Sequence, residues 1–111
     1  MRNLLFILIL VPFLTFASHY EEQEVPEGFT DLCEFWAHFR SSVYVDFKDD
    51  NEIDVYEKWQ KWFIEKMTMT RMVQFNYHFE EMMLTYISDP KMSKDEVFKD
   101  TLQECQEAYR H

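Results

Sequence analysis

The chain has 111 residues, and 21 acidic against 11 basic side chains give it a formal net charge of −10. A charge this negative repels phosphate backbones and anionic lipid surfaces, so we expect no nucleic-acid partner. Gly28 is the only glycine, which argues against a hairpin-rich β fold because tight turns need residues that tolerate positive φ. No nucleophile motif and no glycine-rich phosphate loop is present, so we expect no enzymatic activity and no cofactor.

Residues 1–17 have the pattern of a secretory signal peptide. Arg2 provides the positive start, the stretch from Leu4 to Leu14 is apolar apart from one proline, and small residues precede a cleavage site after Ala17. The apolar run is shorter than the roughly 20 residues that a membrane span needs, although an uncleaved anchor is the alternative. The sequence therefore predicts a secreted, extracellular protein with no membrane span, and loss of Arg2 would change the net charge from −10 to −11.

Residues 18–29 are predicted to form a flexible acidic arm, and residues 30–111 a single helical domain. Four helices are expected, at about 31–45, 52–67, 70–88 and 94–109. Short connections between four helices favour an all-α, up-down-up-down bundle.

The first two helices differ in how much of their circumference is apolar. Asp31 with Glu34 forms a capping pair before the first helix, and Asp50 or Asn51 can cap the second. The first helix has one apolar stripe, made of Leu32, Phe35, Trp36, Phe39, Val43 and Phe47. The second is apolar over more than half of its surface, through Ile53, Val55, Tyr56, Trp59, Trp62, Phe63, Ile64 and Met67. A helix this apolar is expected either to be the central helix of the domain or to form part of an intermolecular face.

The third helix is expected to begin at Thr68 or Thr70 and to end before Pro90. Its main stripe is Met72, Phe75, Phe79, Met82, Met83, Tyr86 and Ile87, and a second ridge is Val73, Tyr77 and Leu84. On the same helical wheel His78 belongs to a polar face with Arg71, Gln74, Glu81 and Thr85. A capping box formed by Ser93 and Glu96 precedes the fourth helix, whose apolar face is Val97, Phe98, Thr101, Leu102, Cys105, Ala108 and Tyr109.

Cys33 and Cys105 are the only cysteines, and an oxidising compartment favours a disulfide between them. In an alternating bundle the start of the first helix and the end of the fourth lie at the same end, so a bond within one chain is the first expectation. Two bonds between partner chains, in a homodimer, are the alternative. In layout alone, the two cysteines and four helices resemble secretoglobins, and this resemblance implies an antiparallel disulfide-linked dimer that encloses an apolar cavity. The acidic arm and the dense tryptophan and phenylalanine content depart from that pattern.

Two groups of residues have some features of a metal site. Four carboxylates fall at ligand positions of an EF-hand-like loop, namely Asp46, Asp50, Asp54 and Glu57. Lys48 stands where an oxygen ligand belongs, and Asn51 replaces the glycine of the sharp turn, so a solvated capping loop is favoured. The second group is His78 with Glu80 and Glu81. We expect these to be solvated surface residues rather than a metal site, since one histidine–carboxylate pair is an incomplete ligand set. No metal is therefore predicted.

Methionines and aromatic residues in the middle of the chain suggest an adaptable apolar surface. The methionines are Met69, Met72, Met82, Met83 and Met92. The residues predicted to form a partner or ligand surface are Trp59, Trp62, Phe63, Met69, Met72, Phe79 and Met83. Core packing is the simpler explanation for many of them. The first functional hypothesis is a non-enzymatic interaction protein that acts on an unknown protein partner through surface contacts. The alternative is a carrier of a small apolar molecule held between helices.

Overall fold

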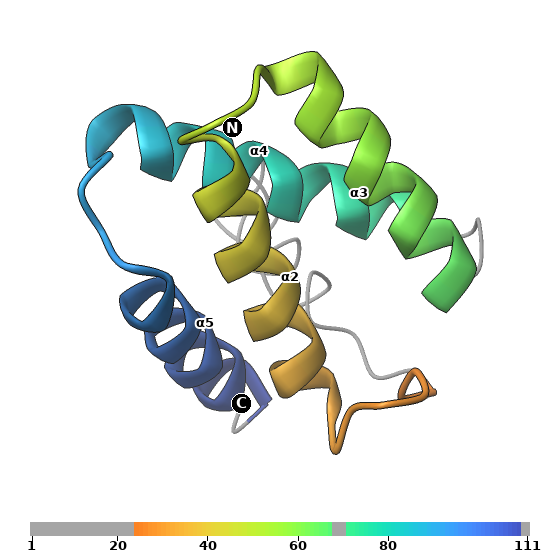
Figure 1. Ribbon diagram of the computed structural model, residues 1–111. Coiled ribbons are helices and arrows are strands. Elements are labelled where there is room, and N and C mark those ends of the chain that lie inside the picture. Colours follow the sequence, from red (N-terminus) through yellow and green to blue (C-terminus); the bar gives the residue numbers. More distant parts are fainter. Residues whose placement is uncertain (1–23, 68–70, 110–111) are drawn as a thin grey trace, which may run out of the picture.

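The computed structural model describes residues 24–67 and 71–109, which contain four α-helices and no strand. With the labels of Figure 1, the helices are α2 (Leu32–Asp46), α3 (Glu52–Lys66), α4 (Met72–Ser88) and α5 (Lys94–Tyr109). Each begins and ends within two residues of its predicted range. No helix in these ranges is long and apolar enough to cross a membrane. The predicted signal peptide, residues 18–23 of the predicted arm, and Thr68, Met69 and Thr70 lie outside the described residues.

Local capping fixes where three of the helices begin. The backbone N–H of Glu34 donates to the Asp31 carboxylate at 2.8 Å, and Asn51 accepts in the same way from Asp54 at 2.9 Å. Before α5, the N–H of Glu96 donates to the Ser93 hydroxyl at 3.1 Å. The N–H of Ser93 donates back to the Glu96 carboxylate at 3.4 Å, so the predicted capping box is formed. α4 begins after Arg71, which makes no side-chain capping bond.

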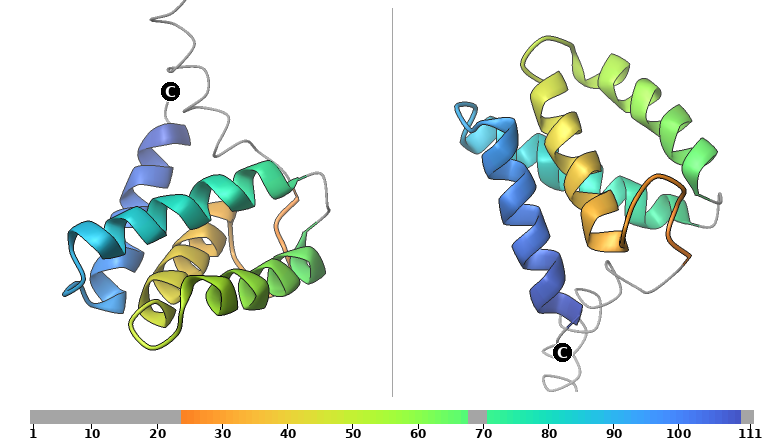
Figure 2. Two further views of the ribbon diagram at one scale, coloured as in Figure 1. Left: turned by 90° about the horizontal axis from the view of Figure 1, so that it is seen from above. Right: turned by 60° about the horizontal axis from the view of Figure 1, so that its bottom comes forward.

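α2 is the central helix of the domain. It packs most extensively against α5 and also contacts α4 and α3. Figures 1 and 2 agree that α3 and α5 flank α2 on opposite sides, while α4 lies along a third side. Because Ala37, Ser41 and Ser42 are small and buried, neighbouring helices can approach α2 closely. Of the two roles expected for the second helix, central helix or part of an intermolecular face, the central role therefore belongs to the first helix instead.

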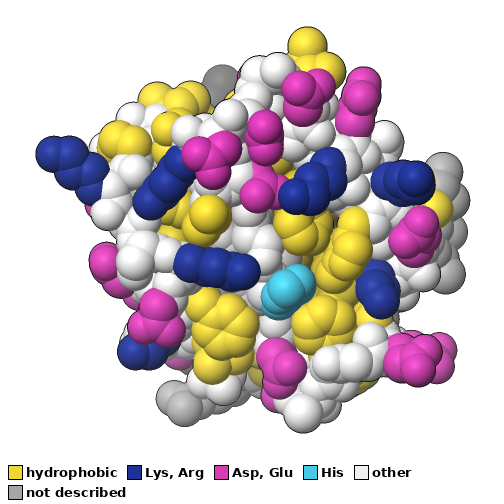
Figure 3. All heavy atoms as spheres, in the orientation of Figure 1, with side chains coloured by type: hydrophobic (Ala, Val, Ile, Leu, Met, Phe, Trp, Pro, Cys, Tyr) yellow, Lys and Arg dark blue, Asp and Glu magenta, His cyan; other side chains and the backbone are white. Residues whose placement is uncertain are grey.

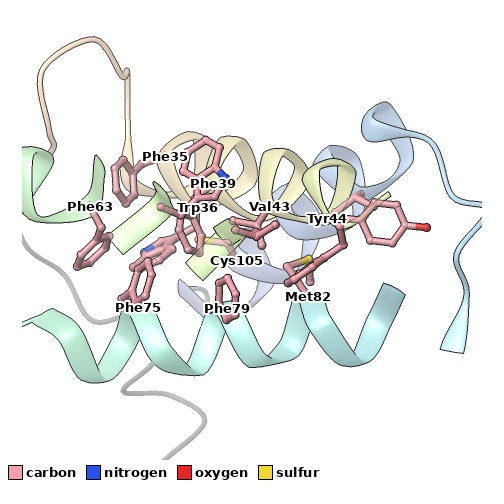
Figure 4. Close-up of a cluster of buried hydrophobic side chains, with 14 of the residues drawn as sticks. Phe35, Trp36, Phe39, Val43, Tyr44, Phe63, Phe75, Phe79, Met82 and Cys105 are labelled. Atoms are coloured by element: carbon pink, nitrogen blue, oxygen red, sulfur yellow. The ribbon is translucent and has the colours of Figure 1, made fainter. Parts of the chain in front are cut away.

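The core is aromatic and is built around α2. Figure 4 shows Phe35, Trp36 and Phe39 pointing toward side chains of the helices around them. All three are fully buried, as are Phe63 of α3 and Phe75 of α4. Most ring pairs meet edge-on or tilted, as in the 5.2 Å contact between Phe63 and Phe75, a geometry worth about 0.5–1.5 kcal/mol per pair beyond area burial. The whole predicted apolar stripe of the first helix lies in the core.

A disulfide joins Cys33 near the start of α2 to Cys105 near the end of α5. The two Cα atoms are 5.5 Å apart, and the bond forms within one chain, as first expected. Both cysteines are buried, at 5% and 0% exposure, so the bond belongs to the core.

The predicted polar face of α4 is wrong at two positions. Gln74 and His78 are buried, and the imidazole of His78 stacks on the indole of Trp36 with ring centroids 4.0 Å apart. α4 is covered along this side because α2 lies against it, whereas a helical wheel assigns polar residue types to solvent. Conversely, Ile87, which was placed on the main apolar stripe, is 69% exposed.

Candidate interaction surface

A half-exposed tryptophan, Trp62 of α3, brings the aromatic core to the molecular surface. Its ring stacks on that of Phe35 with centroids 5.3 Å apart and an angle of 14° between the planes. Trp59 lies edge-on at 5.1 Å, and Phe29 lies edge-on at 6.4 Å. With the neighbouring imidazole of His38, 5.7 Å away, these residues define what we call the Trp62 surface: Phe29, His38, Trp59 and Trp62. Figure 3 shows hydrophobic side chains bordering the histidine on this face.

Each part of the Trp62 surface is held in place by local structure. Gly28 has a φ of +96°, which lets the chain turn so that the N–H of Phe29 donates to the carbonyl of Pro26 at 3.3 Å. The turn places the Phe29 ring against Phe35, at 5.2 Å. The indole N–H of Trp59 donates to the Asp46 carboxylate at 2.7 Å, which fixes that ring from α2.

The imidazole of His38 is the titratable group of the Trp62 surface. Partial burial among the rings lowers the pKa of His38 below its ordinary value of 6.5, and the positive charge of Lys94 lowers it further. The carboxylate of Glu34 opposes both effects. The surroundings of His38 therefore favour the uncharged form of its imidazole beside Trp62 at neutral pH.

The residues predicted as a partner surface are divided between core and surface. Trp62, Met72 and Met83 are partly exposed. Phe63 and Phe79 lie in the core at 0% and 3% exposure, and Trp59 is 7% exposed at the edge of the Trp62 surface. Of the other methionines named for the adaptable apolar surface, Met82 is buried and Met92 is half-buried. The structure brings Trp59 and Trp62 together with two residues that were not predicted for this surface, Phe29 and His38.

A partly buried ion pair that the sequence did not indicate lies between α2 and α5. The Arg40 guanidinium donates to the Glu104 carboxylate at 2.9 Å, and the Arg40 side chain is only 7% exposed. Nearby on α4 the Tyr77 hydroxyl donates to Glu81 at 2.7 Å. Burial raises the pKa of Tyr77, and its bond to the Glu81 carboxylate raises it further. A helical wheel of α2 could have indicated that Arg40 is buried. On the wheel, Cys33, Ala37 and Tyr44 extend the apolar stripe to both sides of Arg40.

Two cavities bear on the carrier hypothesis. A cavity of about 120 Å³ lies next to the Arg40–Glu104 pair, and Thr85, Thr101 and Asp100 also line it. Met82, Met92 and Val97 complete the lining, so it is a mixture of charged, hydroxyl and apolar side chains rather than the predominantly apolar lining of a typical small-molecule site. An open groove of about 490 Å³ lies between residues 24–27 and the end of α3, and its lining is also mixed, with Glu65, Lys66 and Arg71 among the contributors.

Two of the four carboxylates of the EF-hand-like loop, those of Asp46 and Asp54, have other partners. Asp46 accepts from Lys58 at 2.9 Å as well as from Trp59, and Asp54 accepts from the side chain of the capping Asn51 at 2.9 Å. Asp50 donates its backbone N–H to the Asp46 carbonyl at 2.9 Å, and Glu57 is an exposed residue of α3. Within residues 24–67 and 71–109, no three histidine, cysteine or acidic side chains are grouped as metal ligands.

No protein-family model, curated protein or solved structure matches this chain. The functional interpretation therefore depends on the geometry of its own residues.

Proposed function

We propose that the protein is a small, secreted, non-enzymatic interaction protein that binds a partner protein through the Trp62 surface. In this proposal, residues 1–17 are removed as a signal peptide, and the mature chain is an acidic up-down-up-down bundle. The Cys33–Cys105 bond is compatible with an oxidising compartment. The observation that carries the proposal is the half-exposed Trp62 ring stacked on Phe35 at 5.3 Å.

A tryptophan in this setting suits protein binding. Tryptophan is enriched among the few interface residues that provide most of the binding energy, because it buries a large area and has few rotatable bonds. The rings of Phe35, Trp59 and Phe29 already restrict Trp62 in the free protein. Little further side-chain entropy is then lost on binding. The negative charge of the chain also increases the rate of encounter with a basic partner.

The proposal predicts that Trp62→Ala strongly weakens partner binding. The measurement is chemical cross-linking of the oxidised protein in the extracellular fluid of its source, followed by quantitative mass spectrometry. Ile64→Ala is the matched control, since Ile64 is an exposed apolar residue of the same helix at 38% exposure and is absent from the Trp62 surface. Losing one interface tryptophan is expected to weaken binding by about 2 kcal/mol or more, which is roughly thirtyfold.

Circular dichroism and thermal melting of both variants show whether each remains folded, and Trp62→Tyr keeps a ring in place if Trp62→Ala does not fold. Equal capture by the wild type and a folded Trp62→Ala variant would contradict the proposal. A lipophilic fluorophore that saturates one site on the protein, with no captured protein depending on Trp62, would favour the carrier function.

A further inference from the structure

The solvent-facing side of α4 carries large apolar residues at heptad spacing. Val73 is 77% exposed and Ile87 is 69% exposed, and they lie 14 residues apart. Leu84, at 58% exposure, lies one turn before Ile87, and Met83 beside it is half-buried. We call Val73, Asn76, Glu80, Met83, Leu84 and Ile87 the α4 seam. Successive spacings of three and four residues through positions 73, 76, 80, 83 and 87 are those of a helix that pairs with another helix.

The centre of the α4 seam is charged. Glu80 lies seven residues from both Val73 and Ile87, and it is exposed. The other acidic residue of α4, Glu81, accepts the Tyr77 hydroxyl on a different side of the helix. α4 carries no lysine or arginine between Met72 and Ser88. The α4 seam therefore has two apolar ends with two polar side chains between them: Asn76, which accepts from the Tyr56 hydroxyl of α3 at 2.9 Å, and the Glu80 carboxylate at the centre. It is about 21 Å long at 1.5 Å per residue.

The position of Glu80 selects against a second copy of this chain. Because residue 80 is midway between residues 73 and 87, two α4 seams in register would place Glu80 opposite Glu80, whether the helices run parallel or antiparallel. A shift by one heptad would instead bury Glu80 against Val73 or Ile87, which costs desolvation of a carboxylate. A single polar residue at a core position is a known means of specifying which helices pair. The high negative charge of the chain adds to the repulsion between copies.

We propose that the α4 seam docks an amphipathic helix of another protein that carries a lysine or arginine at its centre, flanked by apolar residues. A basic side chain opposite Glu80 would form an ion pair at the middle of the interface, and apolar side chains would cover Val73 at one end and Leu84 and Ile87 at the other. The α4 seam involves a different set of residues from the Trp62 surface, so either site can fail its test without affecting the other.

Three synthetic 21-residue amphipathic peptides test this proposal. They are identical except for lysine, alanine or glutamate at the central core position, and their binding to the oxidised protein is measured by fluorescence anisotropy. The lysine peptide is expected to bind about fivefold or more tightly than the glutamate peptide, as for an attractive against a repulsive exposed charge pair. Glu80→Lys is expected to invert the order. Glu107→Lys on α5 is the matched control, since it changes the net charge equally and should preserve the order.

Self-association provides a second, peptide-free measurement. Glu80→Leu is expected to produce a concentration-dependent dimer in sedimentation equilibrium, whereas Glu107→Leu and the wild type do not gain one. Adding Val73→Asp to Glu80→Leu should abolish that dimer. The proposal is overturned if no peptide binds saturably up to about millimolar concentration, a Kd that corresponds to only about 4 kcal/mol. It is also overturned if Glu80→Lys leaves the peptide order unchanged, or if Glu80→Leu remains monomeric.

Discussion

The buried disulfide allows the most quantitative prediction. Replacing Cys33 and Cys105 by alanine removes a cross-link between residues 72 apart in the sequence. In the chain-entropy model a closed loop of this length stabilises the folded state by about 4 kcal/mol at 25 °C, because it restricts the unfolded chain. A domain of this size has a free energy of unfolding of about 5–15 kcal/mol in total. The alanine variant is therefore expected to keep a free energy of unfolding of about 1–11 kcal/mol.

Urea unfolding followed by circular dichroism measures this effect. The variant should lose about 4 kcal/mol, and its dependence on urea should become steeper, because an unfolded chain without the cross-link exposes more surface. The control is the wild-type protein with the bond chemically reduced, which removes the link but retains both sulfur atoms. A loss below about 1 kcal/mol in both samples would refute the loop-entropy reasoning.

Two further predictions concern α2. Because burial among rings lowers the pKa of His38, protonation favours the unfolded chain. Stability from this residue should be complete above pH 6.5 and should decline as pH falls below 6.5 toward the lower folded-state pKa. A His38→Gln variant should lack this part of the pH dependence of the free energy of unfolding. An NMR titration that gave His38 a pKa above 6.5 would contradict the lowering of its pKa by burial. Tyr44→Phe removes two hydrogen bonds to the loop at residues 89–92, of 2.6 Å and 2.9 Å. The free energy of unfolding is expected to fall by about 2 kcal/mol in urea unfolding, and a change below about 0.5 kcal/mol would show that water replaces these bonds.

Local pattern was sufficient to predict the helices. The apolar stripe of α2, the Asp31 cap and the Ser93–Glu96 box depend on residues within one or two turns of each other, and all are present in the structure. The pairing of Cys33 with Cys105 was also predicted, from an expected oxidising compartment and an expected alternating order of four helices, and the disulfide is present in the structure.

Longer-range packing could not be predicted in the same way. His78 is buried because it lies against Trp36, and Arg40 is buried because Glu104 neutralises it, and each partner is distant in the sequence. A helical wheel cannot show such pairs, since it assigns each side chain by its type alone. The breadth of the apolar surface of α3 suggested a central helix, yet the small side chains of α2 decided which helix the others surround.

The Cys33–Cys105 bond makes everything between α2 and α5 part of one covalent ring. A single cut by a protease in a connection such as residues 89–93 would leave both pieces attached to each other. The ring contacts of α2 with α3 and α4 join residues between positions 35 and 86, so they would remain within one piece. Such a cut would change the mass by one water molecule and would separate fragments on a gel only after reduction. The backbone of this protein can therefore be cleaved between the two cysteines without release of a fragment, as long as the disulfide is intact.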